Sequence, residues 1–205
     1  MRENILKAIK ELREKSKKRK FSQTFDLVVN LKEVDTKKPE NKFTEDVVLP
    51  HGRGEEAKVV VFSDSAKDLK CDVLGSEDLE KLSKNKREAK KLSQRSAFFL
   101  AEPKLMPTVA KVIGQYVGPK GKLPKIISGD VKSLVENYKK SVRIRIKDSP
   151  VIQCLIGQEN MKDEDIAENI EAVLKSLEAK LPKGKNNINK IFVKLTMSRP
   201  VKVEM

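Results

Sequence analysis

The residues with the most distinctive chemistry are the eight of segment 17–24, Lys-Lys-Arg-Lys-Phe-Ser-Gln-Thr. Four consecutive cations suit a phosphate backbone, and an exposed ring beside them suits an unstacked base. A solvated helix end, whose lysines follow the helix dipole, also explains these cations. Taken alone, the segment favours that simpler interpretation, so a nucleic-acid surface needs support from the rest of the chain.

The overall charge supplies part of that support. The chain of 205 residues carries 44 Lys and Arg against 30 Asp and Glu, a net charge of +14. This imbalance indicates a polyanionic partner, most often nucleic acid and less often an anionic membrane. No apolar run approaches the ~18 residues of a membrane span. The amphipathic N-terminus contains acids, unlike a signal peptide, so we expect a cytoplasmic protein with no membrane partner.

Residues that serve enzymes are scarce. His51 is the only histidine, which leaves no histidine pair or triad, and its glycine-rich surroundings favour a capping or hydrogen-bonding role. The sequence lacks Cys-x-x-Cys, His-Glu-x-x-His and a phosphate-binding loop. Cys71 and Cys154 are expected to be buried free thiols. We therefore predict a protein that is not an enzyme, with no cofactor and no metal.

Three other segments have more than one interpretation. Residues 81–95 hold seven cations and one acid, which RNA contact and a solvated helix explain equally well. Residues 118–125, Gly-Pro-Lys-Gly-Lys-Leu-Pro-Lys, could direct lysines and amides toward phosphates or form a stiff loop. Residues 196–199, Thr-Met-Ser-Arg, could form an RNA-reading strand end, although a core position for Met197 is the simpler expectation.

Apolar periodicity predicts the elements that position the terminal segments. Apolar residues at helical spacing predict an N-terminal helix, and an apolar stripe predicts a second helix that begins at Asp163. Short apolar or alternating runs predict strands at 25–31, 43–49, 151–156, 191–197 and 201–204.

The middle of the chain has a different pattern. Predicted strands at 59–62, 71–74, 97–101 and 142–147 alternate with predicted helices at 65–69, 77–93, 105–117 and 131–140. Ser76 and Asp130 are expected to cap the second and fourth of these helices. Strands that alternate with helices indicate an α/β unit with a mostly parallel sheet.

Two breaks divide the chain, Pro-His-Gly-Arg-Gly at 50–54 and Asp-Ser-Pro at 148–150. Each terminal segment is too small for its own core. We therefore predict an α/β protein of two domains: a discontinuous α+β domain from residues 1–53 and 150–205, and an inserted Rossmann-like three-layer α/β domain from residues 54–149. The expected hinge residues at the two crossings are His51, Gly52, Gly54, Ser149 and Pro150.

Five motifs in this order resemble the L-one family of large-subunit ribosomal proteins, the protein of the mobile stalk beside the tRNA exit site, in its archaeal form. The resemblance covers essentially the whole chain. The motifs are KFSQTFDL at 20–27, VVLPHGRG at 47–54, LMPTVAKVIGQYVGPKGKLPK at 105–125, NIEAVL at 169–174 and VKLTM at 193–197.

The resemblance implies a structural constituent of the large ribosomal subunit that binds stalk ribosomal RNA. It also implies that the protein assists release of deacylated tRNA from the exit site and represses translation of its own mRNA. The implied partners are therefore large-subunit ribosomal RNA, exit-site tRNA and the protein's own mRNA, with a monomer off the ribosome. An RNA-binding regulator or chaperone that acts off the ribosome is the alternative, and a nucleotide-dependent enzyme is a third.

The family's main RNA surface lies on the discontinuous domain. By resemblance it carries over to Lys20, Phe21, Thr24, Gly157, Thr196 and Met197. The family usually has Gly where this chain has Ser198, and a glycine there permits close backbone approach or an unusual φ. Arg199 could add a phosphate contact, so Ser198 and Arg199 are also candidates.

Overall fold

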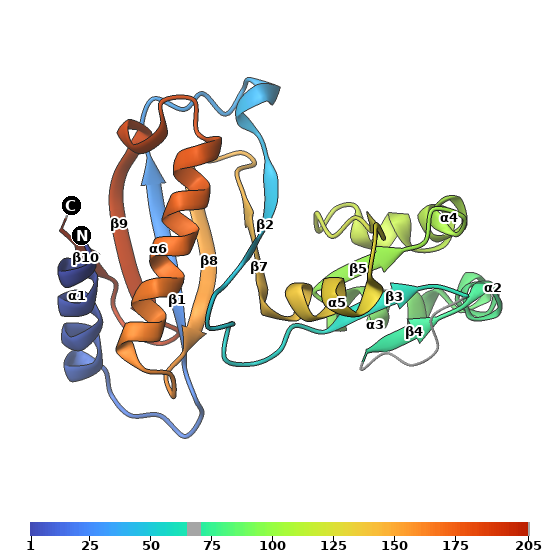
Figure 1. Ribbon diagram of the computed structural model, residues 1–205, viewed down its shortest axis with the longest axis horizontal. Coiled ribbons are helices and arrows are strands. Elements are labelled where there is room, and N and C mark those ends of the chain that lie inside the picture. The colour runs from blue at the N-terminus through green and yellow to red at the C-terminus, as the bar shows by residue number, and fades with distance from the viewer. Residues whose placement is uncertain (65–70, 205) are drawn as a thin grey trace. The chain divides into compact units, whose positions relative to one another are not determined.

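The computed structural model describes residues 1–64 and 71–204, which form two compact units (Figure 1). The first unit comprises Met1–Glu56 together with Lys140–Met205, and the second comprises Ala57–Lys139. The first unit is therefore built from both ends of the chain, and the second is inserted into it. The predicted fold class, α/β with a discontinuous and an inserted part, is confirmed.

The first unit has a four-stranded antiparallel sheet in the order β10-β9-β1-β8 and a separate antiparallel pair, β2-β7. Two α-helices and two short 3-10 helices accompany the sheets. The elements are α1 (Arg2–Lys15), β1 (Thr24–Leu31), η1 (Pro39–Asn41), β2 (Thr44–Val48), β7 (Ser141–Arg145), β8 (Val151–Gln158), α6 (Asp163–Lys180), η2 (Gly184–Asn187), β9 (Ile188–Leu195) and β10 (Val201–Val203).

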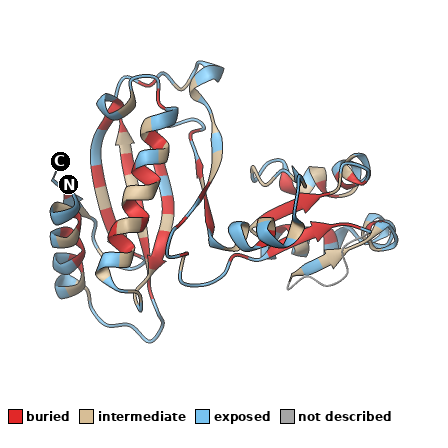
Figure 2. Cartoon of the chain, viewed as in Figure 1, coloured by how far each residue is buried: buried red, intermediate tan, exposed pale blue. Residues whose placement is uncertain are grey.

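Alternation along the strands builds the core of this unit. In β1 every second side chain is buried, beginning with Phe25 and Leu27, and the intervening ones are partly exposed. α1 contributes a buried stripe that includes Ile5, Ile9 and Leu12, as its helical spacing predicts. Figure 1 shows α6 lying over the sheet, nearly along its strands, and α1 beside β10 and β9, and Figure 2 shows buried residues on both helices. This rigid layer fixes the ends of the strands.

The location expected for β7 is wrong. The predicted strand at 142–147 was expected in the inserted α/β domain, but β7 pairs with β2 in the first unit, with Val47 opposite Val142. Arg143 Nε lies 2.7 Å from Asp46 Oδ1 across this pair, and both side chains are largely buried. An alternating strand can pair with any free edge, so its pattern does not reveal its sheet.

The second unit is a parallel sheet in the order β4-β3-β5-β6 with helices on both faces. Leu79 of α2 and Val109 of α4 pack on one face, and Val135 of α5 packs on the other, which gives three layers. The elements are β3 (Val59–Phe62), β4 (Asp72–Leu74), α2 (Ser76–Lys84), α3 (Lys86–Arg95), β5 (Phe98–Ala101), α4 (Met106–Val117), β6 (Lys125–Ile126) and α5 (Val131–Lys140).

Several local expectations for this unit need correction. The predicted helix 77–93 is two helices, because Asn85 ends α2 and its side chain caps α3 by accepting a bond from Glu88 N at 3.3 Å. Gly75, and not Ser76, is the cap residue of α2. The short strand β6 was not predicted. The predicted helix 65–69 lies outside the described residues.

Candidate nucleic-acid interface

The ends of three strands bring the candidate residues of the first unit together. β1 runs antiparallel to both β8 and β9, so its first residues lie beside their last ones: Thr24 is opposite Gln158 and Phe25 is opposite Leu195. Lys20 and Phe21 directly precede β1. Residues 196–199 directly follow β9. Segments about 170 residues apart in the chain therefore meet at one end of the sheet.

Two threonines join these segments. The backbone N–H of Thr24 donates to Thr196 Oγ1 at 3.1 Å, and the two Oγ1 atoms are 2.9 Å apart. The Thr196 N–H donates in turn to the Thr24 carbonyl at 3.1 Å. This reciprocal bonding continues the β1–β9 ladder beyond the strand and holds both hydroxyls at the surface. Hydroxyl groups of this kind can bond RNA 2′-hydroxyls and phosphates.

Met197 and Phe21 point outward beside the threonines. Their side chains are 59% and 51% exposed, respectively, so two large apolar side chains lie at the surface at the same end of the sheet. The core position considered for Met197 is therefore wrong. Exposed apolar side chains beside cations can contact the faces of unstacked bases.

Gln23 fixes the backbone of Met197 from beneath. Its side chain is only 1% exposed, and its Oε1 accepts a bond from Met197 N at 3.2 Å. The backbone of Gln23 makes two hydrogen bonds with Glu159. The Glu159 N–H donates to the Gln23 carbonyl at 2.8 Å, and the Gln23 N–H donates to Glu159 Oε2 at 3.1 Å. Gln23 Nε2 is also buried, and no described residue is its hydrogen-bond partner. Sequence reasoning missed this residue, because nothing in its local pattern signals a buried amide.

Arg13 anchors the same region from α1. Its guanidinium donates to Asp163 Oδ1, to the Glu159 carbonyl and to the Met161 carbonyl, each at 2.7 Å. It also lies over the ring of the buried Phe25, 5.3 Å from the centroid. Arg13 therefore stabilises the turn that follows β8, and Glu159 of this turn bonds the backbone of Gln23. Arg13 was also missed, since a cation on an amphipathic helix looks like an ordinary solvated residue.

Ser198 replaces the expected glycine without backbone strain. Among the described non-glycine residues only Glu33 has a positive φ, so this position does not require glycine. The Ser198 hydroxyl accepts a bond from Leu195 N at 2.8 Å, and Ser198 N donates to the Leu195 carbonyl at 3.1 Å. Ser198 thus closes the turn after β9, and Arg199 follows it with an exposed side chain.

Gly157 lies at the same sheet end but is buried. A Cβ added to it would lie 3.1 Å from Met161 Sδ and 3.4 Å from Ile166 Cγ1. The absence of a side chain at Gly157 therefore lets α6 and the following turn pack closely against β8. This packing gives Gly157 a structural role, and the expected direct RNA contact stays a prediction.

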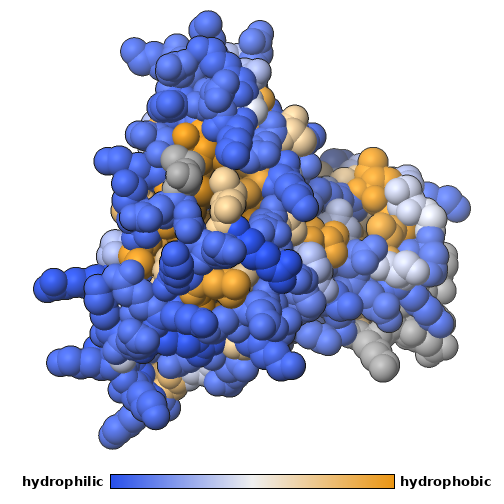
Figure 3. Space-filling model, turned by 60° about the vertical axis from the view of Figure 1, so that its left-hand side comes forward, coloured by the Kyte–Doolittle hydropathy of each residue, from blue (hydrophilic) through white to orange (hydrophobic). Residues whose placement is uncertain are grey.

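We call the exposed and partly exposed candidates the strand-end surface. It comprises Lys20, Phe21, Thr24, Thr196, Met197, Ser198 and Arg199. The face drawn in Figure 3 is mostly hydrophilic, and apolar residues occur on it only in scattered patches.

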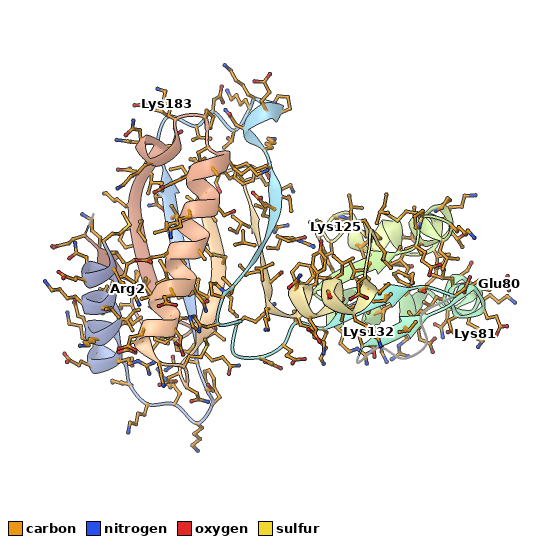
Figure 4. All side chains as sticks on the ribbon, viewed as in Figure 1. Arg2, Glu80, Lys81, Lys125, Lys132 and Lys183 are labelled. Carbon is orange, nitrogen blue, oxygen red and sulfur yellow. The ribbon has the colours of Figure 1, made fainter. Side chains whose placement is uncertain are left out.

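Of the expected hinge residues, His51 has local partners. Its Nε2 lies 2.6 Å from Glu168 Oε2, and Arg2 Nη2 lies 2.7 Å from the other oxygen of Glu168 (Arg2 is labelled in Figure 4). The hydrogen bond from His51 and, to a smaller extent, that from Arg2 hold the pKa of Glu168 below its ordinary value. The bonds agree with the hydrogen-bonding role expected for His51.

The remaining hinge candidates differ in their positions. Gly52 and Gly54 have φ of +68° and +87°, values that favour glycine, and both come just before the chain leaves the first unit. Ser149 and Pro150 do not mark the return, because the first unit resumes at Lys140. The Pro150 carbonyl instead accepts a bond from Leu31 N at 2.8 Å, so the hinge predicted at Ser149 and Pro150 is misplaced.

The lysines of segment 118–125 in the second unit are engaged within that unit. Lys120 Nζ donates to Ser93 Oγ at 3.1 Å, and Lys122 Nζ donates to the Ser96 carbonyl at 2.6 Å. Lys125, labelled in Figure 4, lies over the Tyr138 ring, 5.6 Å from its centroid. These contacts support the stiff-loop interpretation of the segment.

The carboxyl end of the parallel sheet is where an α/β fold would place a nucleotide. A pocket of about 530 Å³ lies there, and its lining includes Asp64, Glu77 and Asp78. Asp64 Oδ1 accepts a hydrogen bond from Ser76 N at 2.8 Å. This backbone N–H at the start of α2 is therefore already bonded to a carboxylate of the protein. Three acids repel phosphate, and the site therefore does not suit a nucleotide.

Over residues 1–64 and 71–204, no helix is both long and apolar enough to cross a membrane. Within the same residues, no group of three or more His, Cys, Asp or Glu side chains is placed to hold a metal ion. Cys154 is a buried free thiol, as predicted, whereas the free thiol of Cys71 is only partly buried.

Comparison with known proteins identifies the family. The family model described as "Ribosomal protein L1p/L10e family" matches residues 6–199. The chain belongs to the ribosomal protein L1p/L10e family. Three similar proteins are each named large ribosomal subunit protein uL1. The protein of Pyrococcus horikoshii is 43% identical to this chain and is covered over 96% of its length. Those of Thermococcus kodakarensis and Methanocaldococcus jannaschii are each 44% identical and are covered over 98% and 96% of their lengths, respectively. Each of the three matches covers 99% of this chain.

The family assignment agrees with the resemblance drawn from the five motifs. One of them, KFSQTFDL at 20–27, leads into β1, and another, VKLTM at 193–197, ends β9. Two of the motifs that carry the family likeness therefore contain five of the seven residues of the strand-end surface.

Proposed function

We propose that this protein is a structural constituent of the large ribosomal subunit and that it binds ribosomal RNA through the strand-end surface. The observation that carries the proposal is the reciprocal bonding of Thr24 and Thr196, which presents hydroxyls beside the exposed Met197 and Phe21. Family membership and the name shared by the similar proteins support the ribosomal setting.

Charge and rigidity make this surface suited to RNA. The segment 17–20 brings four cations to the edge of the surface, and Arg199 adds a fifth. Gln23 and Arg13 hold the backbone beneath the surface. RNA binding therefore costs little conformational entropy of the protein. A preformed set of donors next to cations can select a folded RNA by shape, while the cations supply affinity.

The same surface supports two finer roles, which are part of the proposal. As a stalk component the protein would assist release of deacylated tRNA from the exit site, and it would repress its own mRNA if that mRNA presents a similar fold. Neither role needs catalysis, and the acidic pocket at the parallel sheet argues against a nucleotide-driven enzyme. We propose that the protein acts in the cytoplasm and is a monomer off the ribosome.

The salt dependence of RNA binding tests the proposal. A large-subunit stalk RNA fragment and a random duplex of equal length are titrated with the protein at several salt concentrations. We expect stalk binding to persist at salt levels at which duplex binding collapses. Equal collapse, at the slope expected for ~6–10 released counterions, would mean that the charge acts generically. The alternative function, an RNA-binding regulator or chaperone off the ribosome, would then be preferred.

Substitution of the exposed apolar residues tests the surface itself. Met197→Ala and Phe21→Ala remove side chains that are more than half exposed, so both variants should fold with unchanged melting temperatures. Each should weaken stalk RNA binding by about 1–3 kcal/mol, the range for loss of one base contact. Unchanged affinity in both variants would exclude the strand-end surface as the RNA site.

A further inference from the structure

A groove of about 690 Å³ lies beside the strand-end surface, within the first unit. One wall is the last turn of α1 with the segment 16–19, and the other is the segment 197–202 that leads into β10. It shares Met197, Ser198 and Arg199 with the strand-end surface. An RNA strand bound at that surface therefore lies within reach of the groove.

Unpaired cations line this groove. Lys17, Arg19, Arg199 and Lys202 are all exposed lining residues. Within the described part of the chain, none of the four has a carboxylate at ion-pair distance, whereas Lys15 pairs with the groove's one acid, Glu11, at 2.5 Å. Four unopposed positive charges around one concavity create a potential that attracts anions.

The groove also has apolar lining residues. Pro200 is exposed and Val201 beside it is partly exposed, whereas Leu12, at 1% exposed, lies beneath them as part of the core. A phosphate backbone alone needs only the cations. Apolar side chains next to cations suit a ligand with a flat apolar part and an anionic part, as a nucleotide has. Guanidinium planes, which Arg19 and Arg199 can supply, also stack on bases.

We propose that this groove binds an unstacked nucleotide of the RNA that the strand-end surface holds. The base packs against Pro200 and Val201, and the adjoining phosphates contact Lys17, Arg19 and Lys202. The inference rests on the proposed function and extends the interface to α1 and β10, beyond the residues predicted from the sequence.

Charge-matched variants test the phosphate contacts. The groove variant carries Lys17→Gln, Arg19→Gln and Lys202→Gln, and the control carries Lys37→Gln, Lys38→Gln and Lys185→Gln. Both lower the net charge from +14 to +11. The control side chains are exposed and, within the described residues, also lack ion pairs. Lys37 and Lys38 follow the end of β1, and Lys185 lies in η2, which precedes β9 and follows Lys183, labelled in Figure 4. Leu31 pairs with Ile188 at this end of the sheet, which is opposite the strand-end surface.

Binding of both variants to the stalk RNA fragment is measured at several salt concentrations. Each phosphate contact to a single strand contributes about 0.7 to the slope of log affinity against log salt. We expect the groove variant to have a slope shallower by about 2 and to bind about 10- to 100-fold more weakly at 0.1 M salt, and the control to change much less. Equal losses in both variants would overturn the proposal.

Cross-linking tests the base contact. Stalk RNA that contains 4-thiouridine is bound to the unmodified protein, irradiated and digested, and the modified peptides are identified. We expect cross-links to residues 11–19 and 200–202 as well as to the strand-end surface. Cross-links confined to residues 20–24 and 196–197 would overturn the proposal. So would binding of a polyglutamate peptide as tight as that of an oligouridylate of equal length, since the groove would then be a generic anion site.

The result separates this inference from the proposed function. If Met197→Ala and Phe21→Ala reduce binding but the groove variant behaves like its control, only the groove assignment fails. If the unmodified protein does not prefer stalk RNA to a duplex, the proposed function itself fails.

Discussion

A single buried amide, Asn169, is expected to stabilise the first unit strongly. Its side chain is 0% exposed and makes three hydrogen bonds. It accepts a bond from His51 N at 3.2 Å and donates to the carbonyls of Gly52 and Ile156 at 2.8 and 2.9 Å. Asn169 thereby ties α6 both to the glycine turn at the end of the first terminal segment and to β8. We predict that Asn169→Leu disrupts this connection.

The magnitude follows from the carbonyls that the substitution leaves unpaired. The register between β1 and β8 shifts at Ile156, so this residue lies at a bulge, where ladder pairing is interrupted. Leucine is similar in size to asparagine but cannot donate. Each of the two buried carbonyls that lose their donor costs about 1–3 kcal/mol, so Asn169→Leu should lower the free energy of unfolding by about 2–6 kcal/mol. That is a large share of the roughly 5–15 kcal/mol typical of a folded domain.

Urea unfolding with two probes can locate the effect. The chain has no Trp, and its two tyrosines, Tyr116 and Tyr138, both belong to the second unit. Tyrosine fluorescence therefore reports on that unit, while far-UV circular dichroism reports on the whole chain. Asn169→Leu should lower the dichroism midpoint and leave the fluorescence midpoint in place. The matched control is Asn186→Leu, because Asn186 is exposed.

Two results would refute this reasoning about Asn169. A change in unfolding free energy below about 0.5 kcal/mol would mean that water or relaxation satisfies the carbonyls. Equal shifts of both probes would mean that the two units unfold as one cooperative body, so the effect could not be assigned to the first unit.

Three further predictions concern other groups. Gln23→Leu should weaken stalk RNA binding, whereas Gln23→Glu should restore much of it because a carboxylate still accepts the Met197 N–H bond; equal loss in both would contradict a positioning role. Bonds from Ser133 and Lys132 lower the pKa of Asp130, so its contribution to stability is present above its ordinary pKa and lost as pH falls below it. The urea-midpoint advantage of the unmodified protein over Asp130→Ala should therefore shrink from pH 6 to pH 3. Burial raises the pKa of Cys154 to about 12, so a disulfide reagent at pH 8 should modify Cys71 first and Cys154 only on unfolding.

Residue spacing predicted the elements of the first unit well because each has one buried face. The stripe of Ile5, Ile9 and Leu12 and the alternation from Phe25 along β1 both reflect contact with a single core, so pattern and structure agree. The same logic failed where pairing partners matter. β7 alternates as predicted, yet only the three-dimensional arrangement determines that β2 is its neighbour.

The candidate site was predictable only in part. The resemblance to the family supplied Thr24, Thr196 and Met197, but the residues that hold them are polar side chains with no periodic signal. Gln23 and Arg13 act through backbone groups of distant segments, and a single sequence does not show which segments meet. The break at Asn85 was missed for a related reason, since capping by an asparagine side chain competes with helix continuation and leaves the helical spacing almost intact.

The distribution of cations says more about function than the net charge of +14. Several cations are used by the fold itself: Arg13 holds the turn after β8, Arg143 pairs with a buried carboxylate, and Lys122 bonds main-chain carbonyls. These residues add to the net charge but are already engaged. By contrast, the segment 17–20 with Arg199 and Lys202 gathers, at one end of one sheet, cations that have no ion-pair partner within the described residues. Charge that the fold does not use, concentrated beside exposed apolar side chains and fixed hydroxyls, supports a dedicated RNA surface more strongly than composition alone.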